Sequence, residues 1–123
     1  MILLLDTHVL LWAFGDPDRL SDTRRQLLED RSNTVYVSSV NAAEIAIKAS
    51  IGKLTLEGDL LSLVDDTGFE WIDFTAREAL LLRSLPFHHR DPFDRMLVCQ
   101  ALHRGLPLMT DDPKIAPYGC DVV

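Results

Sequence analysis

The first stretch of the chain constrains the fold most strongly. Residues Ile2–Leu5 are four consecutive apolar side chains with no polar residue between them. A strand with one face in water alternates polar and apolar side chains, whereas a strand of a parallel sheet is buried on both faces and does not. The run ends at Asp6, and the segment Thr7–Phe14 would begin a helix. The sequence therefore predicts a buried parallel strand with an acid at its carboxyl end, where open α/β sheets bind their ligands.

Further predicted strands alternate with helical segments along the rest of the chain. The strand candidates are Val35–Val37, Phe69–Phe74 and Leu106–Thr110, with Cys120–Val123 as a possible edge strand. Strands that alternate with helices build βαβ units and a parallel sheet. We therefore expect an α/β fold in a single domain that spans residues 1–123.

The predicted helices begin at residues that cap helices well. They are a helix after Ser21, one opened by Asn41–Glu44, one over Asp59–Asp66, one after the capping box Thr75–Glu78, one from Asp91 to about His103, and a short one after Asp112.

Composition narrows the class of protein. The 123 residues are 47% hydrophobic and 25% charged, which is ordinary for a globular domain, and no apolar run approaches the ~20 residues of a membrane span. Two cysteines, Cys99 and Cys120, predict reduced thiols and a cytoplasmic protein rather than a disulfide framework. The net charge of −7 argues against broad nonspecific binding of nucleic acid, but a bound cation can reverse the local field.

Acidic residues recur where a predicted strand gives way to a helix or where a helix begins. These acids are Asp6, Glu44, Asp94 and the adjacent pair Asp111 and Asp112. In a parallel sheet such positions share one edge, so the acids can converge on one pocket. Each acid alone also has a capping explanation: Asn41-x-x-Glu44 has the form of a capping box, and Asp91-Pro92 is typical of a helix start. Capping does not explain why so many acids coincide at one edge.

A divalent cation would explain the coincidence. Clustered carboxylates repel one another, and an empty site should raise at least one pKa. Mg²⁺ prefers carboxylate oxygens, whereas the Cys and His spacing of a zinc site is absent from the sequence. One cation can activate water for attack on a phosphoester, and a second can stabilise the leaving oxygen. The acids therefore predict metal-dependent phosphoester hydrolysis.

Four short motifs, in this order, resemble the PIN domain. They are Leu-Leu-Leu-Asp-Thr-His-Val-Leu-Leu-Trp at 3–12, Glu-Ile-Ala-Ile-Lys at 44–48, His-His-Arg-Asp-Pro-Phe-Asp-Arg at 88–95 and Leu-Met-Thr-Asp-Asp at 108–112. More narrowly, they resemble the VapC-type toxins of type II toxin–antitoxin modules, over essentially the whole chain. The resemblance implies a three-layer α/β/α fold with a mostly parallel sheet of four to five strands. It also implies a ribonuclease that uses Mg²⁺ or Mn²⁺, usually homodimeric and blocked by a cognate VapB-type antitoxin.

By the same resemblance, Asp6, Glu44 and Asp94 match the first three acids of the family. The pattern Thr-x-Asp points to Asp112 as the fourth, with Asp111 beside it as the alternative. Asp6 and Asp94 would be direct metal ligands. Glu44 and Asp112 would ligate through water, orient the nucleophile or complete a second metal site.

Polar residues beside the acids are candidate substrate contacts. The hydroxyls of Thr7 and Thr110 could bind a phosphate or a ligating carboxylate. His88 and His89 could act as a general acid or contact a phosphate, or could simply belong to a polar loop.

Two basic residues are candidates for the RNA backbone. Lys48 lies one helical turn after Glu44, so both side chains point the same way, and Arg95 follows Asp94. The alternative for each is an ion pair within its helix or a solvated charge.

Two other functions fit part of the pattern. A catalytically silent PIN-like module that only binds a partner would keep the same fold. A phosphoacceptor receiver-like domain also gathers acids around Mg²⁺, but it needs an acidic pair after its first strand and a lysine after its last. Asp6 stands alone, and no lysine follows the segment Cys120–Val123. The sequence therefore favours the ribonuclease.

Overall fold

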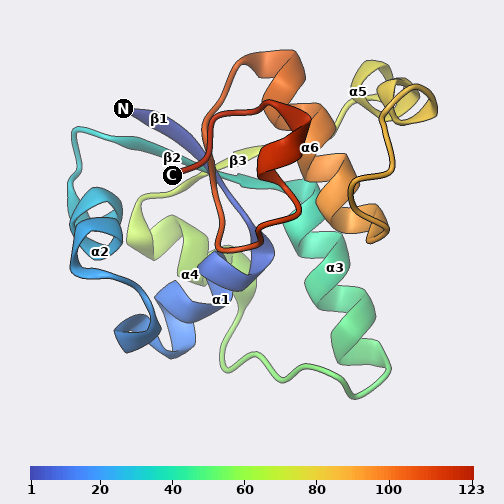
Figure 1. Cartoon of the computed structure of the whole chain (residues 1–123). Coiled ribbons are helices and arrows are strands. Elements are labelled where there is room, and N and C mark those ends of the chain that lie inside the picture. The colour runs from blue at the N-terminus through green and yellow to red at the C-terminus, as the bar shows by residue number, and fades with distance from the viewer.

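A parallel sheet forms the centre of the computed structural model, which describes all residues, 1–123 (Figure 1). Its order is β3-β2-β1-β4, and all three strand pairs are parallel. Strand β1 (Ile2–Leu5) lies between β2 (Thr34–Ser38) and β4 (Leu108–Met109), and β3 (Glu70–Ile72) lies outside β2. The predicted parallel sheet and the place of the first strand inside it are confirmed.

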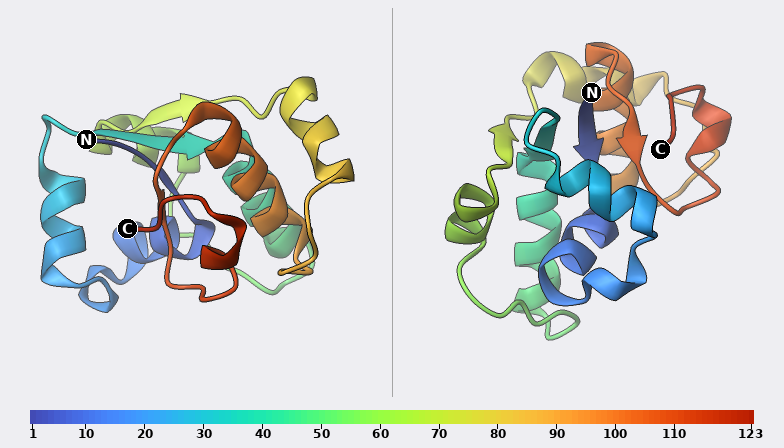
Figure 2. Two further views of the ribbon diagram at one scale, coloured as in Figure 1. Left: turned by 45° about the horizontal axis from the view of Figure 1, so that its top comes forward. Right: turned by 90° about the vertical axis from the view of Figure 1, so that its left-hand side faces the viewer.

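Helices cover both faces of this sheet (Figures 1 and 2). The α-helices are α1 (Thr7–Gly15), α2 (Asp22–Glu29), α3 (Ser39–Ser50), α4 (Leu60–Thr67), α5 (Ala76–Leu80) and α6 (Pro92–Arg104). Three 3-10 turns complete the chain: η1 (Pro17–Arg19), η2 (Leu81–Arg83) and η3 (Ala116–Tyr118). Side chains of α1, α2 and α4 pack on one face, while α6 and η3 pack on the other, so the architecture is the expected three-layer α/β/α fold.

Strand β1 shows why its sequence has no polar residue. Leu3 and Leu5 belong to the core on the α1 side, and Leu4 belongs to the core on the α6 side. All three side chains are completely buried. Burying a leucine stabilises the fold by about 1.5–3 kcal/mol, so both faces of this strand favour apolar residues.

The strands at the edges are shorter than the apolar runs that predicted them. The third strand covers Glu70–Ile72 within the predicted Phe69–Phe74, and β4 keeps two residues of Leu106–Thr110. The predicted edge strand Cys120–Val123 is reduced to one bridge between Val122 and Leu108. A strand extends only over the residues that form hydrogen bonds with a neighbouring strand, and β4 pairs with only the last two residues of β1.

The caps of two helices correct the sequence interpretation of two acids. The capping box of α3 joins Ser38 to Asn41, so the helix begins earlier than predicted and Glu44 is not a capping residue. Asp112 does not begin an α-helix, because its carboxylate accepts the N–H of Lys114 in a turn. The predicted capping box at Thr75 is confirmed. Glu44 is thereby released from the capping explanation, whereas Asp112 caps this turn through Oδ1 and has Oδ2 for the site.

The start and end of α6 agree with the prediction. Asp91 is its N-cap with Pro92 at the first position, and Gly105 ends it with φ 64° in the left-handed region. Cys99 and Cys120 are both unpaired. None of the helices combines the length and the apolar character that crossing a bilayer requires.

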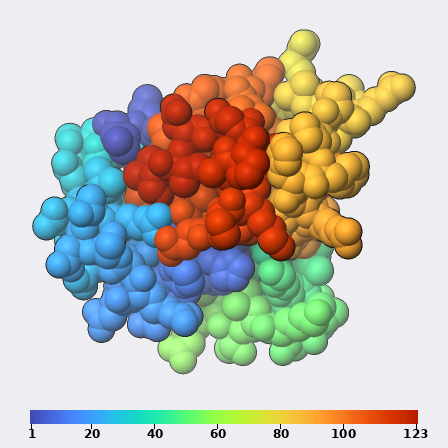
Figure 3. All heavy atoms as spheres, in the orientation of Figure 1, coloured from blue at the N-terminus to red at the C-terminus, as the bar shows by residue number.

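The last residues of the chain lie against its N-terminal third. Arg24 of α2 donates one guanidinium N–H to the main-chain oxygen of Val123 and another to the carbonyl of Thr110, each at 2.9 Å. Figure 3 shows the C-terminal segment in red next to the blue N-terminal segments on one face. This contact ties α2 to the residue after β4, and the pairing of β4 with β1 places that residue beside the end of β1, where the acids gather.

Candidate functional site

Asp6 lies at the carboxyl end of β1 and caps α1. Its Oδ1 accepts the backbone N–H of His8 at 2.7 Å, and its Oδ2 accepts the hydroxyl of Thr110 at 2.6 Å. Burial raises the pKa of this carboxyl, but the hydrogen bonds from His8 and Thr110 outweigh burial and bring the pKa below its ordinary value. Asp6 therefore stays a carboxylate at neutral pH, with both oxygens held in place.

Thr110 links Asp6 to the fourth acid. Its hydroxyl oxygen also accepts the backbone N–H of Asp112 at 3.0 Å. Asp111, the alternative, is half exposed and pairs with Arg24 instead. The structure therefore favours Asp112 over Asp111 as the fourth acid, and Thr110 contacts a site carboxylate, one of its two predicted roles.

Helix α3 brings Glu44 to the same edge. One turn before it, the buried amide of Asn41 donates to the carbonyl of Leu5 at 3.1 Å and to the hydroxyl of Thr7 at 2.9 Å, which ties α3 to the end of β1. Glu44 is itself buried, and its Oε2 accepts the ammonium of Lys48. Its Oε1 is buried without any hydrogen-bond partner.

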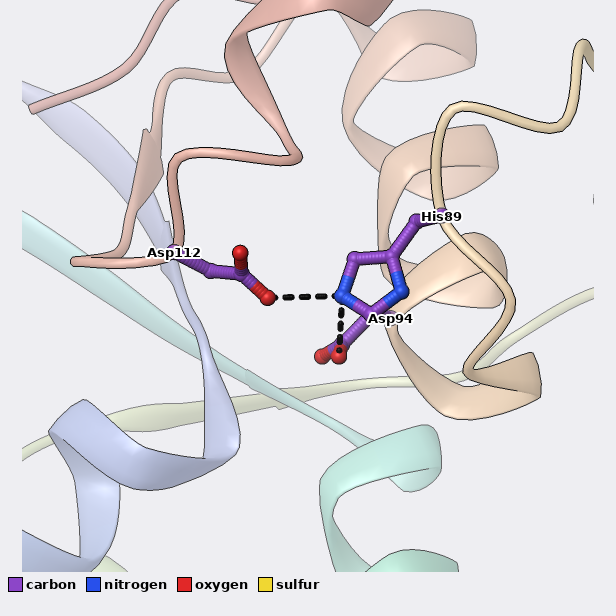
Figure 4. Close-up of side chains that lie close together, drawn as sticks. All are labelled: His89, Asp94 and Asp112. Atoms are coloured by element: carbon purple, nitrogen blue, oxygen red, sulfur yellow. Dashed lines mark hydrogen bonds and ion pairs between the residues drawn. The ribbon is translucent and has the colours of Figure 1, made fainter.

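Helix α6 supplies Asp94 in its first turn, next to the ring of His89. The Nε2 atom of His89 lies 3.0 Å from Oδ2 of Asp94 and 2.6 Å from Oδ2 of Asp112 (Figure 4). Ligand atoms of these three residues lie within 4.8 Å of one another, close enough to hold a metal ion. The site thus joins the end of β4 to the start of α6.

The carboxyl of Asp94 has the most perturbed environment of the four acids. Burial raises its pKa, and the negative charges of Asp6, Asp91 and Glu44 raise it further, to about 7, against a smaller opposing effect of His89. The predicted repulsion among the acids is therefore present. Asp6 and Glu44 lie outside the tight group of three but close enough to act on Asp94 electrostatically.

The residues present fit a divalent cation. A buried carboxylate oxygen without a partner, such as Oε1 of Glu44, is costly unless it ligates or binds something. The raised pKa of Asp94 means that its negative charge is poorly compensated. Carboxylate oxygens predominate in the site, and such donor sets suit hard cations of the Mg²⁺, Mn²⁺ and Ca²⁺ type.

The two basic candidates differ in their placement. Lys48 forms the predicted ion pair with Glu44, and this hydrogen bond raises the pKa of its ammonium group. The guanidinium of Arg95 is buried and donates to the carbonyls of Pro86 at 2.8 Å and Leu85 at 3.2 Å. The predicted RNA contact of Arg95 is replaced by a structural role, because its donors are occupied by the 85–90 loop.

The hydroxyl of Thr7 is likewise buried, where it accepts from the amide of Asn41. This bond uses the hydroxyl oxygen of Thr7 as an acceptor and leaves its hydrogen available for donation, so the contact with a phosphate stays a prediction. The sequence did not reveal the place of Asn41 in the site, and it offered His89 as a candidate without indicating that the ring would lie between Asp94 and Asp112. A single-turn spacing from Asn41 to Glu44 was visible, but the capping-box pattern offered a simpler explanation for it.

Known proteins resemble this chain in sequence. Residues 3–119 match the model of the PIN domain family. The chain is 28% identical over 118 residues to Ribonuclease VapC22 of Mycobacterium tuberculosis, covering 94% of this chain and 90% of that protein.

Solved structures with the same fold include toxin–antitoxin complexes. DNA-bound VapBC from Salmonella typhimurium superposes with a TM-score of 0.71 at 19% identity, over 100% of this chain and 98% of that one. VapBC2 from Rickettsia felis, bound to a DNA fragment of its promoter, gives a TM-score of 0.68 at 19% identity, over 99% and 96%. These superpositions establish the fold, and the family model extends over nearly every residue described above. The chain therefore belongs to the PIN domain family.

Proposed function

We propose that this chain is a metal-dependent endoribonuclease and the toxin of a type II toxin–antitoxin module. The observation that carries the proposal is the poorly compensated negative charge at the carboxyl edge of the sheet, where the pKa of Asp94 rises to about 7 and Oε1 of Glu44 has no partner. The PIN family membership and a relative named as a ribonuclease support RNA as the substrate.

Four carboxylates would hold the cation. Asp6 and Asp94 would ligate directly, and Glu44 and Asp112 would ligate through water or complete a second site. The cation would be Mg²⁺, for which Mn²⁺ can substitute, since both accept oxygen donors. When bound, it supplies the Lewis acidity that lets water attack a phosphodiester near neutral pH and that neutralises charge developing on the phosphate.

The residues of the chain prepare this chemistry by holding charge and protons in defined places. Thr110 and the backbone of His8 keep Asp6 ionised and in one orientation. Asp94 must release its proton before it can ligate, because its pKa lies near 7. Oε1 of Glu44 has free lone pairs, so it can orient a water molecule and accept its proton.

A pocket beside Glu44 offers a path for the RNA backbone. Its volume is about 310 Å³, and its lining includes Thr7, His8, Lys48 and Lys53. The protein carries a net charge of −7, so most of its surface repels phosphates. The two lysines place positive charge at this pocket, where they can attract the phosphates of RNA. In the proposed complex, Lys48 contacts a phosphate once the cation compensates Glu44. The products would carry 5′-phosphate and 3′-hydroxyl ends.

A cognate antitoxin of the VapB type would cover this edge of the sheet. The support is the likeness to VapBC complexes from several bacteria, in which the toxin is bound to its antitoxin. We also propose a homodimer that joins the antitoxin in a hetero-oligomer in the cytoplasm. The PIN family match argues against the receiver-like alternative.

The test is cleavage of total RNA by purified protein with Mg²⁺, Mn²⁺ or EDTA. Wild type should fragment RNA only with metal, whereas Asp6→Asn and Asp94→Asn should be inactive and folded. Asp66→Asn, which removes an exposed carboxylate from α4, is the matched control and should cleave normally. Full cleavage by both site variants would refute the proposal. Absence of cleavage by wild type, with antitoxin binding retained, would support the silent binding module instead.

A further inference from the structure

The ring of His89 lies between two carboxylates of the site. A single atom, Nε2, is 2.6 Å from Oδ2 of Asp112 and 3.0 Å from Oδ2 of Asp94 (Figure 4). His89 is buried, with 8% of its surface exposed. Two roles fit these distances: Nε2 could bind a cation through its lone pair, or it could donate a hydrogen to the carboxylates.

The other ring nitrogen decides between them. Nδ1 accepts the backbone N–H of Asp91 at 3.1 Å. A backbone N–H can only donate, so Nδ1 presents its lone pair, and the hydrogen of the ring belongs on Nε2. A nitrogen that carries a hydrogen has no lone pair for a metal. Binding a cation through Nε2 would require the ring to move its hydrogen to Nδ1 and would leave the N–H of Asp91 unpaired at the start of α6.

The backbone of His89 is held as firmly as its ring. Its N–H donates to the hydroxyl of Tyr118 at 2.8 Å, and its carbonyl accepts a guanidinium N–H of Arg95 at 3.3 Å. Arg95 also binds the carbonyl of Pro86 at 2.8 Å, and the ring of Phe87 covers its guanidinium at 3.9 Å. The 85–90 loop is therefore anchored to α6 and η3, and the direction of the imidazole is set from both ends.

We propose that His89 is a positioning residue of the acid site, which donates its Nε2 hydrogen to Asp112 and Asp94 and stays outside the ligands of the cation. The inference rests on the proposed function. Sharing one hydrogen between two carboxylates reduces their repulsion and sets the orientation of each, as outer partners of metal ligands do. The ligand set then remains all oxygen, which favours Mg²⁺ and Mn²⁺ over metals that prefer imidazole.

Conservative replacement separates positioning from ligation. The amide of Gln places an N–H donor near the position of His Nε2, so His89→Gln should keep the Mn²⁺ dissociation constant within about threefold of wild type. His89→Ala removes the donor and should weaken Mn²⁺ binding by about tenfold or more. His103→Ala is the matched control, since His103 is an exposed histidine in the last turn of α6, and it should bind Mn²⁺ as wild type does.

Two spectroscopic measurements report directly which nitrogen of the His89 ring carries the hydrogen and whether the ring coordinates Mn²⁺. Nitrogen-15 NMR of the metal-free protein should show His89 with hydrogen on Nε2 and a bare Nδ1. Pulsed electron paramagnetic resonance of the Mn²⁺ protein should show no directly coordinated ¹⁴N. A coordinated ¹⁴N signal that disappears in His89→Gln would overturn the proposal, as would hydrogen on Nδ1 in the NMR spectrum.

Stability measurements complete the test. If His89→Ala unfolds more easily but binds Mn²⁺ as tightly as wild type, the residue is only structural and the proposal fails. If His89→Ala does not fold, His89→Gln and the two spectra decide the question. Failure of wild type to bind Mn²⁺ would instead overturn the proposed metal-dependent function, while the NMR spectrum would still report whether His89 is a donor.

Discussion

Replacing Asp94 by Asn should make the metal-free protein more stable at pH 8. The pKa of Asp94 is about 7 in the folded protein, against 3.8 for an ordinary aspartate. Between these values the folded state binds more protons than the unfolded state, so this carboxyl makes stability fall as the pH rises. The loss of folding stability caused by ionised Asp94 is absent below about pH 4, grows between pH 4 and pH 7 and reaches its full size above pH 7.

The gain in stability from Asp94→Asn can be calculated from the difference between the pKa of Asp94 in the folded protein and that of an ordinary aspartate. About 3 pKa units at 1.36 kcal/mol each give about 4 kcal/mol as an upper limit. Asp94 keeps 14% of its side chain exposed and water can approach it, so a gain of about 2 kcal/mol is realistic. In a chain of this length, 1 kcal/mol moves the melting temperature by roughly 4 °C. Asp94→Asn should therefore melt about 8 °C higher than wild type at pH 8 in EDTA and no higher at pH 4.

Urea and thermal unfolding in EDTA, from pH 4 to pH 8, measure this difference. Asp66→Asn removes one negative charge from an exposed site and should match wild type at every pH. Saturating Mn²⁺, at about 100 times its dissociation constant, should stabilise wild type by about 2.7 kcal/mol and Asp94→Asn by less. The reasoning is wrong if Asp94→Asn gains nothing at pH 8, or if its gain is the same at pH 4.

Four further outcomes follow from the contacts of the site and the core. Lys48→Gln removes the ammonium group that pairs with Glu44, so the Mn²⁺ affinity measured by calorimetry should rise several-fold. In an Asp94→Asn background, the same replacement removes one proposed phosphate contact, so RNA binding should become less sensitive to salt. Between pH 5 and pH 7, Mn²⁺ affinity of wild type should rise by about tenfold per pH unit, because Asp94 must lose its proton. Arg24→Ala should cost about 2 kcal/mol in urea unfolding, since the main-chain oxygens of Thr110 and Val123 and the carboxylate of Asp111 lose a charged donor. Glu78→Ala should cost about 3 kcal/mol, since this fully buried carboxylate binds a guanidinium, and should leave Mn²⁺ affinity unchanged.

Matched variants control for general effects on the fold. Arg25→Ala lies next to Arg24 but pairs only with side chains, so it should cost less than about 1 kcal/mol. Glu57→Ala, at an exposed position, controls for Glu78→Ala. An equal loss in either pair would contradict the specific contacts described above. Unchanged Mn²⁺ affinity in Lys48→Gln, or an affinity independent of pH, would contradict the electrostatic account of the site.

The fold could be predicted from the sequence where the pattern of apolar residues along a segment reflects which of its faces are buried. The run Ile2–Leu5 is apolar because both its faces are covered, and this alone placed β1 inside a parallel sheet. The length of β4 could not be predicted, since it depends on how far β4 runs beside the edge of β1, where only Leu4 and Leu5 pair with it. Asp112 looked like a helix N-cap because a following proline is compatible with both a helix start and a turn.

Helix geometry explains where the two basic residues lie relative to the acids. Lys48 is four residues after Glu44, so both lie on one face of α3, and their ion pair could be predicted. Arg95 is one residue after Asp94, which turns it by about 100° around α6 and away from the acids. The position of the His89 ring depends on the path of the loop before α6, and no local sequence pattern predicts that path. Its donor role appears only when the bond between Nδ1 and Asp91 is known.

The bond between Asp6 and Thr110 joins residues separated by 104 positions, and this has a consequence for the timing of synthesis. The first strand leaves the ribosome early, but its acid has no second partner until the segment after β4 has emerged. At typical rates of elongation, that delay is on the order of ten seconds. Until that segment emerges, a nascent chain lacks the second partner of Asp6, and a binding partner already present has that interval in which to meet the incomplete pocket.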